Sequence, residues 1–193
     1  MAVTNVLIAG VGGQGAVLAS ELLALAAIAA GYDAKQGEFH GVAQRGGSVF
    51  SHVRFGDQVF SPMARRGEVD YLVALEKLEA LRYAHFVKPG GTIIVNDHKV
   101  EPIRTADRRP YPDDAIDFLR TKGFNVVALH ATDTAIALGN HRAANVVMLG
   151  KLAESLDIPG EVWDRILQER IPERFRELNQ RAFTAAREQV ASG

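Results

Sequence analysis

The stretch VTNVLIAGVGGQGAVLASELLALAAIAAGYDAKQGEF, residues 3–39, decides the fold class. It opens with a short apolar run rich in β-branched residues, which is typical of a strand, and then passes into a cluster of glycines. Leu18, Leu22 and Leu25 recur at helical spacing, and Gly31 marks the end of this helix before a second extended run. Strand, helix and strand in this order predict a βαβ unit.

Further apolar runs follow along the chain, each short enough for a strand and bounded by turn residues or by helical patterns. Nearly continuous apolar runs of this kind are typical of strands that are buried on both faces of a sheet. After the last of them the pattern is helical up to the C-terminus. The runs cover residues 69–76, 92–97 and 125–130.

The alternation of strands and helices predicts the architecture. We expect one α/β domain over residues 1–193, with a doubly wound, Rossmann-like and mostly parallel sheet that carries helices on both faces. The sheet core should span residues 1–140, and a helical C-terminal part should span residues 141–193. Around the Gly56-Asp57 turn, the flanking segments also predict a β-hairpin.

Composition excludes several function classes. The net charge is -1, without the basic surplus that nucleic-acid binding needs. The chain has no cysteine, so it cannot hold an iron-sulfur cluster, a thiolate zinc site or a disulfide. No pair of histidines has metal-ligand spacing, and we expect no metal site. The apolar run 16–30 contains Ser20 and Glu21 and is too short for a membrane span, so we expect a cytoplasmic protein.

A glycine motif of the form GxGxxG lies at the exit of the first predicted strand. Its residues are Gly10, Gly12, Gly13, Gln14 and Gly15. Glycines at this spacing permit a tight turn and let backbone N–H groups approach a phosphate, which makes the turn a candidate site for coenzyme A or another phosphate. The alternative is that the glycines serve only the close turn from strand to helix.

A second candidate site is the stretch GEFHGVAQRGGSV, residues 37–49, which we interpret as a polar loop at the carboxyl end of the second strand. That edge of a doubly wound sheet is where ligands and partners bind. Arg45 can pair with a carboxylate or a phosphate through two parallel hydrogen bonds. We expect an interface and ligand loop without a catalytic residue, formed by Glu38, Phe39, His40, Gly41, Gln44, Arg45, Gly46, Gly47 and Ser48.

Five segments in one order carry a resemblance to a known family. GVGGQGAVLAS, GEFHGVAQRGGSVFSHVRFG, SPMARRGEVDYLVALEKLEALR, GGTIIVND and GNHRAANVVMLGKLAE resemble the gamma subunits of thiamine-diphosphate-dependent 2-oxoacid:ferredoxin oxidoreductases, and in particular the small (beta) subunits of indolepyruvate ferredoxin oxidoreductase. The resemblance runs from about Val3 to Glu154, and HGVAQRGGSV together with GxGGQG is its most specific part.

The resemblance implies a non-cluster subunit of a multisubunit enzyme. Large partner subunits would bind thiamine diphosphate and 4Fe-4S clusters, decarboxylate an aryl-2-oxoacid to an acyl-CoA and pass electrons to ferredoxin or a similar acceptor. This chain would support assembly and the coenzyme A side of the active site, and would be inactive alone. Two alternatives stay open: a free-standing NAD(P)- or flavin-dependent oxidoreductase, with Glu38 as the ribose-binding carboxylate, and an assembly module without a ligand.

Overall fold

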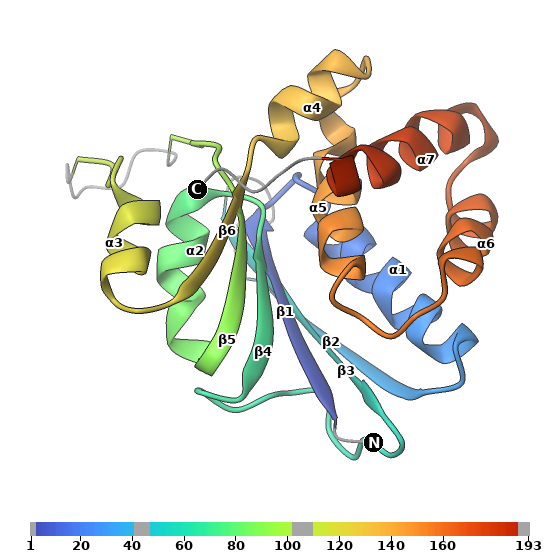
Figure 1. The fold of residues 1–193 in the computed structure, drawn as a ribbon, viewed down its shortest axis with the longest axis horizontal. Helices are drawn as coiled ribbons and strands as arrows, with labels where there is room; N and C mark the ends of the chain where they lie inside the picture. The colour runs from blue at the N-terminus through green and yellow to red at the C-terminus, as the bar shows by residue number, and fades with distance from the viewer. Residues whose placement is uncertain (1–2, 41–46, 102–109, 189–193) are drawn as a thin grey trace.

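A computed structural model describes residues 3–40, 47–101 and 110–188. Its centre is a six-stranded sheet with the strand order β2-β3-β1-β4-β5-β6 (Figure 1). The strands β1, β4, β5 and β6 are parallel, and β3 pairs antiparallel with both β1 and β2. The strands are β1 (Thr4–Val11), β2 (Asp33–His40), β3 (Ser48–Gly56), β4 (Val69–Ala74), β5 (Val87–Asn96) and β6 (Asn125–Leu129).

Helices cover both faces of the sheet. Figure 1 shows α2 and α3 on one face, and α1, α5, α6 and α7 on the other. The α-helices are α1 (Ala16–Ala29), α2 (Lys77–Tyr83), α3 (Ala115–Thr121), α4 (Ala131–Ala137), α5 (Ala144–Ala153), α6 (Gly160–Arg170) and α7 (Glu173–Glu188), and the short 3-10 helices are η1 (Ala84–Phe86) and η2 (His141–Ala143).

The predicted α/β class with a mostly parallel sheet is confirmed, but the predicted hairpin is wrong. No strand follows β3 at residues 58–61; instead β3 pairs along its length with β2 on one side and β1 on the other. Asp33 accepts a hydrogen bond from the backbone N–H of Val59 at 2.8 Å, which ties this connection to the start of β2. The first βαβ unit therefore does not place its two strands side by side, because β3 lies between them.

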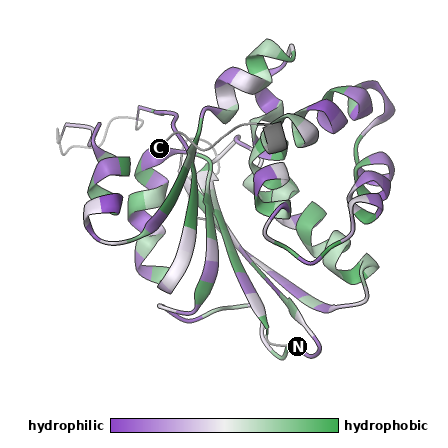
Figure 2. Cartoon of the chain, viewed as in Figure 1, coloured by the Kyte–Doolittle hydropathy of each residue, from purple (hydrophilic) through white to green (hydrophobic). Residues whose placement is uncertain are grey.

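The hydrophobic core lies on both faces of the sheet. Along β1, Val6 and Ile8 join a cluster with α1, α5, α6 and α7, whereas Leu7 and Ala9 join a cluster with α2 and α3. All four residues are fully buried, which explains why the strand reads as a continuous apolar run. Figure 2 shows α1 largely in the hydrophobic colours. Within the described part of the chain, no helix is both long and apolar enough to cross a membrane.

Candidate functional site

The glycine turn lies between β1 and α1, at the carboxyl edge of the parallel strands. Gly13 and Gly15 have φ angles of +106° and +82°, a region that glycine adopts without a steric penalty. Gly15 is the N-cap of α1, and no side chain caps this helix end. The turn therefore depends on glycine at two positions to reverse the chain tightly.

The side chain of Gln14 is used inside the fold. Its Oε1 accepts a hydrogen bond from Val11 N at 2.8 Å, and its Nε2 donates to the carbonyl oxygen of Leu75 at 3.2 Å. The same carbonyl accepts from Asn96 Nδ2 at 3.1 Å. Gln14 thus joins the turn to the carboxyl ends of β4 and β5, and its contribution is to hold the turn in place.

Asn145 on α5 fixes the other side of the turn. Its Nδ2 donates to Gly15 O at 3.0 Å, and a Cβ added to Gly15 would lie 2.4 Å from that nitrogen. Asn145 is 3% exposed. Its position explains why a glycine is required here for packing as well as for the backbone conformation.

Replacing Gly13 and Gly15 by alanine separates the requirement of the backbone conformation from the requirement of packing. Gly13→Ala should lower the free energy of unfolding by about 1 kcal/mol, because a Cβ there meets no atom within 4 Å and only the positive φ is penalised. Gly15→Ala should cost about 2 kcal/mol, because the contact with Asn145 adds to the same backbone penalty. Urea unfolding of both variants measures the difference, and equal losses would contradict the role of Asn145.

The glycine turn and the second predicted motif meet in space. The backbone N–H of Gly12 donates to the carbonyl oxygen of Gly47 at 2.8 Å, and Val11 is opposite Ser48 in the β1–β3 ladder. The end of the predicted loop is therefore attached directly to the turn. The predicted residues Gly41, Gln44, Arg45 and Gly46 lie outside the described residues.

The start of the predicted loop is a strand, so the loop assignment was wrong for residues 37–40. β2 extends to His40 because this segment forms an antiparallel ladder with β3. Phe39 stacks on Phe50 across that ladder, with ring centroids 5.1 Å apart and an interplanar angle of 15°. An aromatic pair of this kind stabilises a strand pair, which gives Phe39 a structural role.

Glu38 does not lie where a ribose-binding carboxylate would. It is exposed and accepts a hydrogen bond from Gln36 Nε2 at 3.2 Å. In a dinucleotide-binding fold the acidic residue ends the strand beside the one that carries the glycine turn. Here β3 occupies that place, with Ser51 opposite Glu38. The arrangement disfavours a nicotinamide site.

A hydrogen-bonded cluster that the sequence did not predict surrounds Ser48. Its hydroxyl donates to the Glu79 carboxylate in a short hydrogen bond and lies 2.8 Å from the Tyr83 hydroxyl. Glu79 is 3% exposed, and burial raises the pKa of its carboxyl group, against the opposing effect of the hydrogen bond from Ser48. Arg82 lies 3.4 Å from the other carboxylate oxygen. The cluster anchors the start of β3 to α2. This helix lies on the face of the sheet opposite to α1, into which the glycine turn leads.

A second buried carboxylate, Glu76, caps α2. It accepts hydrogen bonds from Glu79 N at 3.0 Å and Val100 N at 3.2 Å, and from the Tyr111 hydroxyl. Burial and the nearby Glu76 carboxylate raise the pKa of Tyr111 far above its ordinary range, so the hydroxyl stays a donor. All of these contacts are internal, and they assign Glu76 a structural role. Two carboxylates three residues apart after a buried strand were the only signal in the sequence.

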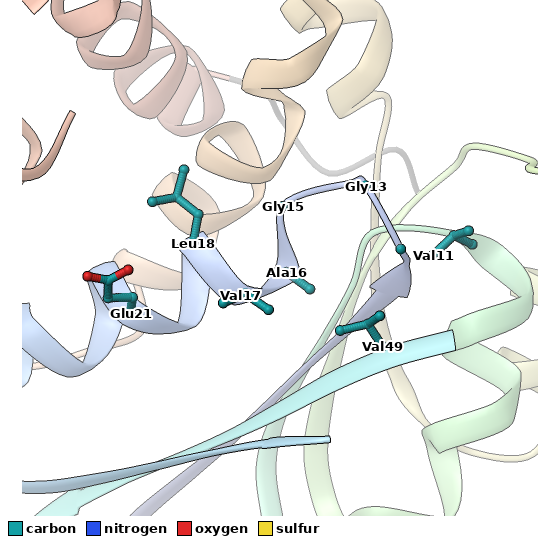
Figure 3. Close-up of a pocket in the computed structure, with 9 residues that line it drawn as sticks. Val11, Gly13, Gly15, Ala16, Val17, Leu18, Glu21 and Val49 are labelled. Atoms are coloured by element: carbon teal, nitrogen blue, oxygen red, sulfur yellow. The ribbon is translucent and has the colours of Figure 1, made fainter. Parts of the chain in front are cut away.

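A groove of about 530 Å³ opens beside the glycine turn (Figure 3). Val17 and Leu18 on α1 are 37% and 36% exposed in it. Among the described lining residues none is basic, and the acidic one, Glu21, forms an ion pair with Arg170. The groove is lined by Val11, Gly12, Gly13, Gly15, Ala16, Val17, Leu18, Glu21 and Val49.

The groove and the glycine turn beside it are suited to binding another molecule. The Ser48 hydroxyl is bonded to the Glu79 carboxylate, and the Gln14 amide is bonded to backbone atoms. The described residues contain no cluster of three or more acidic or histidine side chains that could hold a metal ion. The groove offers apolar side chains next to the backbone of the glycine turn. Such a surface can hold a thin, mostly apolar group or a segment of another protein.

Comparisons with known proteins give one consistent result. The sequence profile of the pyruvate ferredoxin/flavodoxin oxidoreductase family matches residues 5–189. The chain is 38% identical over 194 residues to the indolepyruvate oxidoreductase subunit IorB of Archaeoglobus fulgidus, with 98% of this chain and 96% of that protein covered. It is 36% identical over 185 residues to the subunit of the same name from Pyrococcus horikoshii, with 93% and 92% covered.

A solved structure has the same fold. The gamma subunit of a keto/oxoacid ferredoxin oxidoreductase from Geobacter sulfurreducens superposes with a TM-score of 0.71 at 28% identity, and 96% of each chain is covered.

Proposed function

The chain belongs to the pyruvate ferredoxin/flavodoxin oxidoreductase family, and from this premise we propose that it is the non-cluster subunit of a multisubunit 2-oxoacid oxidoreductase. Its relatives with 36% and 38% identity are indolepyruvate oxidoreductase subunits, which favours an aryl-2-oxoacid such as indolepyruvate as the substrate of the complex. The complex would convert the 2-oxoacid to an acyl-CoA and pass electrons to ferredoxin or a similar acceptor.

In the proposed complex the larger subunit holds the redox groups. Thiamine diphosphate supplies decarboxylation there, and 4Fe-4S clusters supply electron transfer. This chain does not fit a cluster, because it contains no cysteine to ligate iron. Its own contribution is to bind the larger subunit and to shape the side of the active site that coenzyme A approaches.

The observation that carries this proposal is the hydrogen bond from Gly12 N to Gly47 O. It joins the two most specific sequence motifs at the carboxyl edge of the sheet, next to the apolar groove. That edge is where α/β sheets bind ligands. The glycines of the turn allow a close approach of the backbone, as a thin ligand such as the arm of coenzyme A requires.

The competing function is a free-standing nicotinamide enzyme. It is supported by the GxGxxG spacing alone. The insertion of β3 between β1 and β2, and the absence of a basic residue among the described groove residues, count against it.

Purification of the tagged chain from its native host tests the proposal. We expect it to co-purify with a larger subunit that contains thiamine diphosphate and iron, and the complex to reduce ferredoxin only when both the 2-oxoacid and coenzyme A are present. The chain expressed alone is the control and should be colourless and inactive. Tight binding of NAD or NADP by the isolated chain, without a cluster-bearing partner, would overturn the proposal.

A further inference from the structure

A second groove adjoins the first one. It has a volume of about 180 Å³ and is formed by α1, η2, α5 and the start of α7. Leu18 lines both grooves, so the second groove lies beside the first one along α1. We call this second groove the α1–α7 groove, and besides Leu18 it is lined chiefly by Asn140, Arg142, Ile171, Phe175 and Leu178.

Large apolar side chains are exposed in and beside the α1–α7 groove. Val17, Leu18 and Phe175 are 37%, 36% and 36% exposed, although large apolar side chains gain free energy from burial. Val17 and Leu18 lie next to one another on α1, and Leu18 and Phe175 both line the α1–α7 groove. Grouped apolar side chains at the surface typically mark a contact with another molecule.

The positive charge of Arg142 at the edge of the α1–α7 groove indicates which kind of molecule the groove binds. Arg142 is exposed, and within the described residues its guanidinium group has no carboxylate partner. Glu21, the acidic residue that lines the adjoining first groove, is already paired with Arg170. The groove therefore offers one uncompensated positive charge beside an apolar floor. The complementary surface is an apolar segment that carries a carboxylate.

We propose that the α1–α7 groove is the docking site for an apolar segment of the larger oxidoreductase subunit, with a carboxylate of that segment opposite Arg142. The proposal rests on the proposed function, since it takes the larger subunit as the partner. It adds a contact surface built by α1, η2 and α7, which are far apart in the sequence and distinct from the predicted loop. Apolar side chains supply the affinity, and the ion pair fixes the register.

Two substitutions test the proposal, each with a matched control elsewhere on the surface. Leu18→Asp places a charge on the apolar floor, and Ile136→Asp does the same at a 58% exposed apolar residue outside both grooves. Arg142→Glu reverses the rim charge, and Arg165→Glu reverses an exposed arginine on α6. Circular dichroism melting of all four isolated variants checks that each is folded.

The measurement is the dissociation constant between each variant and the larger subunit purified from the native complex. We expect Leu18→Asp and Arg142→Glu each to raise it by at least about tenfold, and both controls to leave it unchanged. For Arg142→Glu the loss should shrink at high salt, because screening weakens ion pairs.

Three results would overturn the docking site. One is unchanged affinity of both groove variants. The second is a raised KM for coenzyme A with unchanged affinity, which would make the coenzyme the occupant. The third is dimers of the isolated parent chain that Leu18→Asp dissociates, which would make a second copy the occupant. If the parent chain binds no cluster-bearing subunit at all, the proposed function itself fails.

Discussion

Replacing Gly150 by alanine should lower the free energy of unfolding by about 3 kcal/mol or more. Gly150 lies in the middle of α5, where a Cβ would come within 2.1 Å of the backbone carbonyl oxygen of Phe183 and 3.2 Å of the Ala186 Cβ. Both neighbours belong to α7, and a backbone oxygen cannot turn away as a side chain can. The added methyl group can be accommodated only if α5 and α7 move apart.

Urea unfolding of Gly150→Ala measures this cost. Gly160→Ala is the matched control, because it is also a glycine-to-alanine change in a helix and a Cβ there meets no atom within 4 Å. The control should be neutral or stabilising by up to about 1 kcal/mol, since alanine has the higher helix propensity. A Gly150→Ala variant as stable as the control would mean that α5 and α7 are not in direct backbone contact.

The parent protein should also lose stability in mild acid because of His52. This side chain is fully buried on β3, and neither ring nitrogen has a hydrogen-bond partner in the described structure. Phe39, Phe50 and Phe86 surround the ring at centroid distances of 5.9, 5.8 and 5.5 Å. Burial, assisted by the charge of Arg54, lowers the pKa of His52 from 6.5 to about 4.

Proton linkage determines whether the free energy of unfolding rises or falls with pH. In the unfolded chain His52 takes up a proton near pH 6.5, whereas in the folded protein it does so near pH 4. Between these values the unfolded state binds more protons, so the free energy of unfolding falls by up to about 1.4 kcal/mol per pH unit as the pH falls, and by roughly 3 kcal/mol in total. Above pH 6.5 the contribution is constant.

The variant His52→Leu isolates this effect. It cannot be protonated and leaves no unpaired buried nitrogen, so its stability relative to the parent should rise steadily from pH 7 to pH 4. Urea unfolding at several pH values gives this difference, in which the titration of the other groups cancels. His141→Ala, at an exposed histidine, should show no such trend. A pH-independent difference for His52→Leu would contradict a buried neutral imidazole.

The sequence predicted most strands because their residues are apolar on both faces. Val6 to Ala9 illustrate this, since each is covered by a helix layer and no polar residue interrupts the run. The family resemblance drawn from five motifs is confirmed. Local pattern did not predict the position of β3, because its partners are chosen by pairing between segments far apart in the chain. For the same reason Phe39, at the end of the second extended run, was taken for a loop residue.

The glycine turn between the first strand and the first helix was predicted from the sequence, but its internal contacts were not. The glycine turn and Gly47 do meet, as two motifs at the same edge should. The bonds that hold the turn come from Leu75 and Asn145, which lie 61 and 130 residues from Gln14 and Gly15 respectively. Nothing in the spacing of a single sequence marks such distant partners. The α1–α7 groove likewise depends on how α7 packs against α5.

Two of the helices that pack on α1 are synthesised long after it, and this has a consequence for biosynthesis. α1 is among the first elements to leave the ribosome, yet the hydrogen bond between Gly15 and Asn145 spans 130 residues, and α5 and α6 follow most of the sheet along the chain. β1, β2 and β3 can cover one side of α1 early, but the side that packs against α5 and α6 has no native cover until these helices emerge. Contacts of such long range close slowly, and exposed apolar surface favours aggregation in the meantime. We therefore expect chaperones to bind this side of α1 until α5 and α6 have been synthesised.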